Sequence, residues 1–176
     1  IKDAAKRLQQ IQSIDHLFYA MKANANLDVL KAIYESNTGI ECVSLNEVNF
    51  IIKQFPSINP KQILFTPNFA SREEYQSALA KKIFVTVDSL YPLSHWPDIF
   101  AGKEIILRID PGYGAGHHKF VCTGGVESKF GIAIEDIPEI LTLSNKHKIK
   151  IIGLHIHSGS GIRQPDIWAQ SANVLL

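Results

Sequence analysis

Short runs of apolar and β-branched residues recur along the chain, and each is followed by a segment whose apolar positions have helical spacing. The runs cover residues 16–21, 38–43, 62–66, 83–87, 104–110 and 149–157. The first five end near Lys22, Val43, Thr66, Val87 and Asp110, at intervals of 21, 23, 21 and 23 residues. Runs of this length and composition are typical of strands. The pattern therefore predicts six strands in repeating units of nearly one size.

The segments between the runs carry recognisable helix starts. Asn26 stands before one amphipathic stretch, Ser44 before the next and Ser71 before a third. Glu47 and Glu74 follow the two serines at the capping-box distance of three residues. Helices that alternate with strands in this way predict βαβ units and a parallel sheet.

A barrel explains this regular repeat of strand–helix units better than a doubly wound sheet does. No glycine-rich dinucleotide loop follows the first run, and the unit size is uniform, so we expect an α/β fold of the (β/α)8 TIM-barrel type. A complete barrel of eight units takes about 250 residues. The chain has 176 residues, begins with Ile1 and ends within a helical pattern. We therefore expect residues 1–176 to form one incomplete barrel domain of about six units.

Composition and charge narrow the class of protein. The chain has 18 basic and 17 acidic residues with a net charge of +1, and they are scattered, so we expect no nucleic-acid partner. Its longest apolar runs are too short to span a membrane, and its first residues lack the apolar core of a signal peptide. Two cysteines, Cys42 and Cys122, are too few for a disulfide framework and lack metal-site spacing. These features predict a cytoplasmic protein.

Polar residues at the predicted strand ends are the candidates for chemistry, because barrel active sites lie at the carboxyl ends of the strands. They are Lys22, Glu41, Arg108, Asp110, His155 and His157. Taken singly, each could be a solvated or a core residue. Strand alternation, however, places Ala20 with Lys22, Arg108 with Asp110, and His155 with His157 on shared faces. If those faces line the barrel, a lysine, an arginine and a histidine converge on one mouth.

The turn that follows the sixth strand adds a candidate phosphate site. It reads HSGSG over residues 157–161 and is rich in backbone N–H groups. Such a turn can bind a phosphate, with the Ser160 hydroxyl as a further donor.

Five motifs occur in the order found in one enzyme family. They are YAMKAN at 19–24, GIECVSLNE at 39–47, LRIDPG at 107–112, SKFG at 128–131 and HIHSGSG at 155–161. The series resembles the alanine-racemase-like barrel of the group IV pyridoxal-phosphate-dependent decarboxylases, which include the diaminopimelate, ornithine and arginine decarboxylases. Residues 85–96 and 108–132 are most similar to diaminopimelate decarboxylases, especially to the decarboxylase part of enzymes fused to aspartate kinase.

This resemblance implies pyridoxal 5'-phosphate as cofactor and Lys22 as the lysine that binds it covalently. His157, the second catalytic residue, would stack on the pyridine ring. Arg108 and Glu41 would lie around the cofactor and the lysine, although Asp is common at the position of Glu41.

The resemblance also implies a phosphate site in the HSGSG turn. Ser160 would bind the phosphate together with the backbone of Gly159 and Gly161. Ser158 replaces an apolar residue of the family pattern, and alternation directs its side chain away from the cofactor.

The function implied is decarboxylation of a basic or diamino acid, first of all meso-diaminopimelate to L-lysine in lysine biosynthesis. The alternatives are an ornithine or arginine decarboxylase and a non-catalytic relative that binds the cofactor. We expect the intact enzyme to be a homodimer. The last barrel units, a glycine-rich phosphate loop, the acid that pairs with the pyridine nitrogen and a β-domain would lie beyond Leu176. We therefore expect the 176 residues alone to be inactive.

Two other enzyme classes are weaker alternatives. A racemase of this barrel type continues AYGHG after its lysine, which NANLDVL does not match. A metal-dependent hydrolase could use a His155-x-His157 pair, but that pair ends the sixth strand and has no evident acidic partner. We expect His117 and His118, in a glycine-rich loop, to be solvated or to line the rim of the barrel rather than to be ligands. We expect no metal site.

Overall fold

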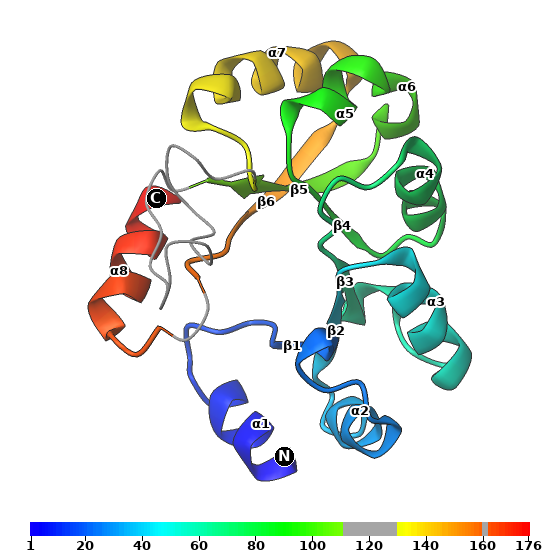
Figure 1. Cartoon of the computed structure of the whole chain (residues 1–176), viewed down its shortest axis with the longest axis vertical. Helices are drawn as coiled ribbons and strands as arrows, with labels where there is room; N and C mark the ends of the chain where they lie inside the picture. The colour runs from blue at the N-terminus through cyan, green and yellow to red at the C-terminus, as the bar shows by residue number, and fades with distance from the viewer. Residues whose placement is uncertain (111–129, 160–161) are drawn as a thin grey trace. The chain divides into compact units, whose positions relative to one another are not determined.

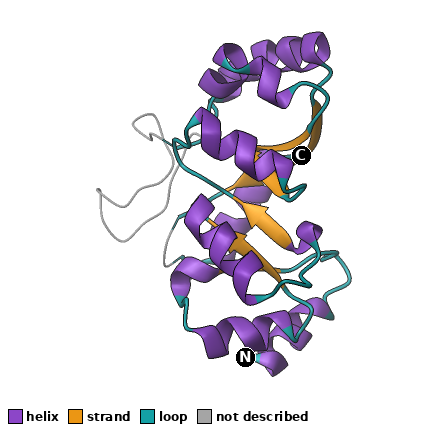
Figure 2. Cartoon of the chain, turned by 90° about the vertical axis from the view of Figure 1, so that its right-hand side faces the viewer, coloured by secondary structure: helices purple, strands orange, loops and turns teal. Residues whose placement is uncertain are grey.

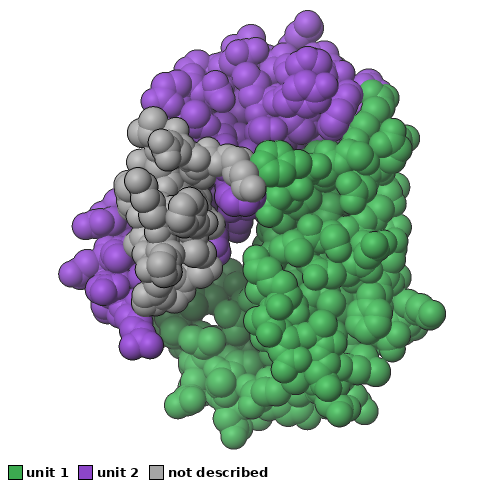
Figure 3. Space-filling model, viewed as in Figure 1, with its two compact units in different colours: residues 1–85 green, residues 86–176 purple. Residues whose placement is uncertain are grey.

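The computed structural model describes residues 1–110, 130–159 and 162–176. The chain divides into two compact units, residues 1–85 and residues 86–176 (Figure 3). Strands are joined by helices along the whole described chain (Figures 1 and 2). The strands are β1 Phe18–Ala20, β2 Gly39–Cys42, β3 Ile63–Phe65, β4 Phe84–Val87, β5 Glu104–Ile109 and β6 Lys150–Ile156.

The helices fill the intervals that the sequence pattern predicts. The α-helices are α1 Lys2–Gln9, α2 Leu27–Tyr34, α3 Leu45–Gln54, α4 Arg72–Ala80, α5 Leu90–His95, α6 Pro97–Phe100, α7 Ile137–His147 and α8 Pro165–Val174. Three short 3-10 helices are η1 Met21–Ala23, η2 Pro60–Gln62 and η3 Ile134–Asp136.

Each strand pairs in parallel with the next one, in the order β1-β2-β3-β4-β5-β6. The six predicted strands are thus confirmed, and their observed ends lie within two residues of the predicted ones. Within the described residues, β1 pairs only with β2 and β6 only with β5. The sheet therefore has two strands with one partner each, as an incomplete barrel requires.

In unit 1, one face of the sheet packs on helices. Ile40 and Cys42 of β2 and Ile63 and Phe65 of β3 are fully buried. The Phe65 ring meets the ring of Tyr75 in α4 at 6.5 Å in a T-shaped contact. Since side chains alternate along a strand, the residues between these buried positions face the opposite side, away from the helices.

Gly39 shapes that opposite face at the start of β2. A Cβ atom added there would lie 2.5 Å from Cδ1 of Phe18, so only glycine lets the aromatic ring lie over the strand. The Phe18 ring meets the Phe84 ring edge-on at 6.2 Å, and Nζ of Lys61 lies 4.5 Å from the Phe84 centroid. This cluster fills the sheet face at the amino ends of the strands.

The predicted helix caps are present. Ser71 and Glu74 form a reciprocal capping box at α4. Ser44 Oγ accepts a hydrogen bond from the backbone N–H of Glu47 at 3.2 Å. The Glu47 carboxylate, however, accepts from the N–H of Val43 at 2.7 Å, one residue before the predicted partner Ser44. The Glu47 side chain thus links the first turn of α3 to the residue that follows β2 by a hydrogen bond.

In unit 2, a short segment extends the sheet beside β5. The N–H of Ile132 donates to the carbonyl of Arg108 at 2.7 Å, and the N–H of Asp110 donates to the carbonyl of Ile132 at 2.9 Å. Gly131 has a φ of +91°, and a Cβ atom there would lie 2.7 Å from the Asp110 nitrogen. Only glycine therefore fits this position of the SKFG motif.

The pairing of β5 with β6 contains a bulge. Ile105 pairs with Ile151, but Ile106 pairs with Gly153, so Ile152 has no register partner. The bulge shifts the alternation of β6 by one residue.

Candidate active site

Lys22 lies just beyond the end of β1. The strand ends at Ala20, and η1 carries Lys22. Strand alternation does not extend to Lys22, because the backbone turns into a 3-10 helix after Ala20, and the shared face of these two residues stays a prediction. The Lys22 side chain is 52% exposed, and its Nζ lies 4.0 Å from Oε1 of Glu41. Its amine is thus accessible and stands beside a carboxylate.

Glu41 and Thr66 meet on the sheet face opposite the helices. Glu41 is the register partner of Ala20 in β1 and of Leu64 in β3. The Thr66 hydroxyl donates a hydrogen bond to Oε1 of Glu41. Thr66 is buried, and its N–H donates to the carbonyl of Cys42 at 2.8 Å. We identified Thr66 in the sequence only as a strand end, although a polar residue at that place was a usable signal.

Cys42 lies on the helix-packed face beside this group. Its Sγ lies 3.8 Å from Sδ of Met21. Burial raises the pKa of the Cys42 thiol far above its usual range, and the nearby Glu47 and Glu41 carboxylates raise it further. The thiol therefore stays protonated and has no nucleophilic role.

Unit 2 holds the second set of predicted residues. Arg108 is buried, and its guanidinium lies 5.2 Å from the Phe130 ring centroid. Its register partner in β6 is His155, so the two side chains share a face. His157 follows the last residue of β6 and is half-buried. Gly159 has a φ of +127°, which favours glycine in this turn.

Several predictions fall outside the described residues or between the units. Ser160 and Gly161 of the proposed phosphate site lie outside the described residues, as does the loop with His117 and His118. The structure brings Lys22 and Glu41 together in unit 1 and places Arg108 beside His155 in unit 2. Convergence of the two sets on one mouth stays a prediction, as does the choice of His157 over His155 for the cofactor ring.

Comparison with known proteins identifies the family. Residues 1–175 match the family described as pyridoxal-dependent decarboxylase, pyridoxal binding domain. The chain belongs to this family. The family resemblance of the sequence motifs is confirmed, and pyridoxal phosphate is the cofactor of this pyridoxal-binding domain.

Individual relatives agree with this assignment. The diaminopimelate decarboxylase of Methanothermobacter thermautotrophicus is 35% identical over 161 residues, which are 91% of this chain and 37% of that protein. The crystal structure of a diaminopimelate decarboxylase variant from Helicobacter pylori, complexed with L-lysine, has a TM-score of 0.84 at 27% identity. It covers 98% of this chain and 46% of that one.

A more distant structure shows the fold alone. The arginine decarboxylase of Paramecium bursaria Chlorella virus, bound to agmatine, has a TM-score of 0.74 at 20% identity and covers 98% of this chain and 48% of that one. The predicted fold class, a pyridoxal-phosphate-binding α/β barrel present in part, is confirmed. This pyridoxal-binding chain spans about 37% of the length of the archaeal relative.

The donor set of the described residues fits pyridoxal phosphate. An aldehyde needs an accessible amine, and the Lys22 side chain is half exposed at a strand end. A phosphate needs backbone N–H donors, and Gly159, three residues after the end of β6, has a φ of +127° that favours glycine. Arg108 supplies a buried cation on the same strand pair.

The part of the chain that the structure describes also bears on metal binding and on membrane spanning. No group of three or more His, Cys, Asp or Glu side chains there could hold a metal ion. No helix among the described residues has the length and apolar character needed to cross a membrane.

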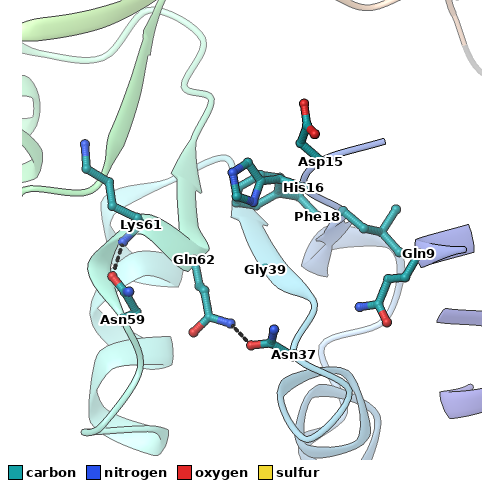
Figure 4. Close-up of a pocket in the computed structure, with 10 residues that line it drawn as sticks. Gln9, Asp15, His16, Phe18, Asn37, Gly39, Asn59, Lys61 and Gln62 are labelled. Carbon is teal, nitrogen blue, oxygen red and sulfur yellow. Dashed lines mark hydrogen bonds between the residues drawn. The ribbon is translucent and has the colours of Figure 1, made fainter. Parts of the chain in front are cut away.

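Unit 1 also has a pocket of about 450 Å³ at the amino ends of β1 to β3, opposite the strand ends near Lys22 (Figure 4). Two of its lining amides pair with each other, since Nε2 of Gln62 donates to Oδ1 of Asn37 at 2.8 Å. Oδ1 of Asn59 accepts from the N–H of Lys61 at 2.9 Å. The amino-terminal face of a barrel generally serves stability, and we assign this pocket no catalytic role.

Proposed function

We propose that the intact protein is a pyridoxal-phosphate-dependent carboxy-lyase that decarboxylates meso-diaminopimelate to L-lysine. The observation that carries the proposal is the family match over residues 1–175 together with 35% identity to a diaminopimelate decarboxylase. Ornithine and arginine are the second candidates for substrate, because the sequence motifs resemble a group that includes the ornithine and arginine decarboxylases.

Lys22 is the residue that attaches the cofactor in this proposal. Its Nζ is accessible and lies beside the Glu41 carboxylate, which orients the amine. When bound, the cofactor supplies a conjugated ring that accepts the electron pair left as carbon dioxide departs. The Lys22 amine would also move a proton at the substrate α-carbon.

The residues of unit 2 hold the cofactor in place. Arg108 contributes a buried positive charge, and His157 packs against the ring. The backbone of Gly159 and Gly161 and the Ser160 hydroxyl bind the phosphate. A fixed ring and phosphate orient the scissile bond of the substrate, which is the main contribution of the protein in cofactor catalysis.

The proposal also covers the domain organisation, assembly and localisation of the intact enzyme. Residues 1–176 form a partial barrel domain, and the intact protein is a cytoplasmic homodimer without a nucleic-acid partner. Light scattering on the full-length protein measures the assembly, and a monomer mass would contradict the dimer.

Carbon dioxide release by the full-length protein tests the activity. We expect release from meso-diaminopimelate to exceed release from ornithine and arginine, and L-lysine to accumulate in equal amount. The Lys22→Ala variant is the control and should release none. A preference for ornithine or arginine would refute the substrate, and no release from any of the three would identify a non-catalytic relative.

A further inference from the structure

Three polar side chains from consecutive strand ends form a connected series in unit 1. Oε1 of Glu41 faces Nζ of Lys22 at 4.0 Å, and the same oxygen accepts the hydrogen bond of the Thr66 hydroxyl. The Lys22 side chain is 52% exposed and the Glu41 side chain 13%, and Thr66 as a whole residue is buried. Thr66 is thus the buried member of this group of three, and Lys22 is the solvent-accessible one.

The surroundings of Thr66 hold its hydroxyl in place. Its backbone N–H donates a hydrogen bond to the carbonyl of Cys42, which extends the pairing of β2 with β3 by one residue. The preceding residue, Phe65, is fully buried against Tyr75 of α4. As a β-branched residue, threonine has restricted χ1 freedom, so a fixed backbone also fixes the hydroxyl.

Glu41, by contrast, has a flexible side chain at a partly open position. Its backbone belongs to β2, but three side-chain torsions lie between that backbone and the carboxylate. Lys22 and Thr66 both contact Oε1 of this carboxylate. The Thr66 hydroxyl therefore determines that Oε1 stays beside the lysine amine.

We propose that Thr66 is a positioning residue for cofactor attachment. Its hydroxyl holds the Glu41 carboxylate against Lys22, and the carboxylate in turn orients the Lys22 amine toward an incoming aldehyde. The proposal rests on the proposed role of Lys22, which it extends by one residue that does not itself touch the cofactor.

The test measures the rate of covalent attachment in full-length protein freed of cofactor. Pyridoxal phosphate is added, attachment is followed by absorbance, and borohydride reduction with peptide mapping gives the fraction fixed on Lys22. We expect Thr66→Val to slow attachment roughly tenfold, the loss typical of a hydrogen bond to a charged group. Thr66→Ser keeps the hydroxyl and should restore the rate to within about twofold.

Thr38 offers a matched control for a general effect on the core. It is also a buried threonine of unit 1, and its Oγ1 accepts from Nε2 of Gln9 at 3.1 Å, at the amino end of β2. Thr38→Val should leave the attachment rate unchanged. Equal slowing by Thr38→Val and Thr66→Val would overturn the proposal, because loss of packing would then explain both.

A double substitution tests whether Thr66 acts through Glu41. Glu41→Ala alone should slow attachment, and Thr66→Val added to it should slow it no further. Additive effects, or a wild-type rate in Thr66→Val, would overturn the proposal. If Thr66→Val does not fold, Thr66→Ala takes its place with the same expected loss. Label on a lysine other than Lys22 in the wild-type protein would instead refute the proposed function.

Discussion

The accessibility of Lys22 follows from the place where β1 ends. Strand alternation does not place Lys22, because β1 ends two residues before it, at Ala20. The 3-10 helix η1 instead turns the backbone after Ala20. The side chain is therefore half exposed, with one carboxylate, that of Glu41, beside it. An accessible amine with a defined neighbour suits attack on an aldehyde.

Borohydride reduction of the full-length protein with pyridoxal phosphate should label the peptide that contains Lys22. The expectation rests on the exposed Nζ and on the YAMKAN motif. Mass spectrometry of the digested protein locates the label, and Lys22→Ala should remove it. A label that persists in Lys22→Ala, on another lysine, would end the assignment.

Cys42 should make the stability of the fold depend on pH in the alkaline range. Its pKa in the folded state is raised from the ordinary 9.0, chiefly by burial, so the unfolded chain releases the thiol proton first. Stability from this group is fully present below pH 9 and falls as the pH rises above it, by at most about 1.4 kcal/mol per pH unit.

Urea unfolding from pH 8 to pH 10 measures that dependence. Other groups titrate in the same range, so the comparison is with Cys42→Ala, which should be less stable at pH 8 but lose less stability on going to pH 10. Parallel curves for the two proteins would show that the thiol does not contribute.

At the scale of elements, Gly131 decides whether the segment 130–132 can join β5. Its φ of +91° and the 2.7 Å distance from a built Cβ to the Asp110 nitrogen both disfavour any side chain. The same segment brings the Phe130 ring to the Arg108 guanidinium. Glycine here therefore supports a residue of the proposed cofactor site.

Gly131→Ala should destabilise the full-length protein by more than Gly102→Ala does. Gly102 also has a positive φ, +69°, but a Cβ there meets nothing within 4 Å. Gly102→Ala should thus lose about 1 kcal/mol from backbone strain alone. Gly131→Ala adds a clash with backbone. Denaturant unfolding of both variants compares them, and equal losses would show that the close approach is relieved without a penalty.

At the scale of the whole molecule, the first and last strands have one partner each in the described part of the chain. On β6, Ile152 and Leu154 are both 45% exposed, which leaves apolar surface on a strand that has a partner on one edge only in the described part of the chain. Such an edge favours association with other chains. The relatives that this chain matches are longer, and a closed barrel would cover both edges.

The 176 residues expressed alone should therefore be catalytically inactive and prone to self-association. We expect no carbon dioxide release from meso-diaminopimelate and weak or absent attachment of pyridoxal phosphate. Full-length protein is the positive control in the same assays, and light scattering reports the association. Turnover by a protein whose mass confirms an end at Leu176 would contradict the prediction.

The sequence by itself determined the order and type of the elements and the family. Strand and helix periods, N-caps such as Ser44 and Ser71, and the YAMKAN and SKFG motifs depend on residues close together in the chain, so they can be read locally. These features were enough to predict six parallel strands and Lys22 beside Glu41.

Only the tertiary structure decided which residues of different strands contact one another. The hydrogen bond from Thr66 to Glu41 joins residues 25 positions apart. The fit of Phe18 over Gly39 and of Gly131 against Asp110 depends on where separate segments meet in space. Strand register and close approach follow from pairing over long sequence distances, which no local period encodes. For this reason the sequence indicated a role for Lys22, whereas it showed Thr66 only as the end of a strand and not as the hydrogen-bond partner of Glu41.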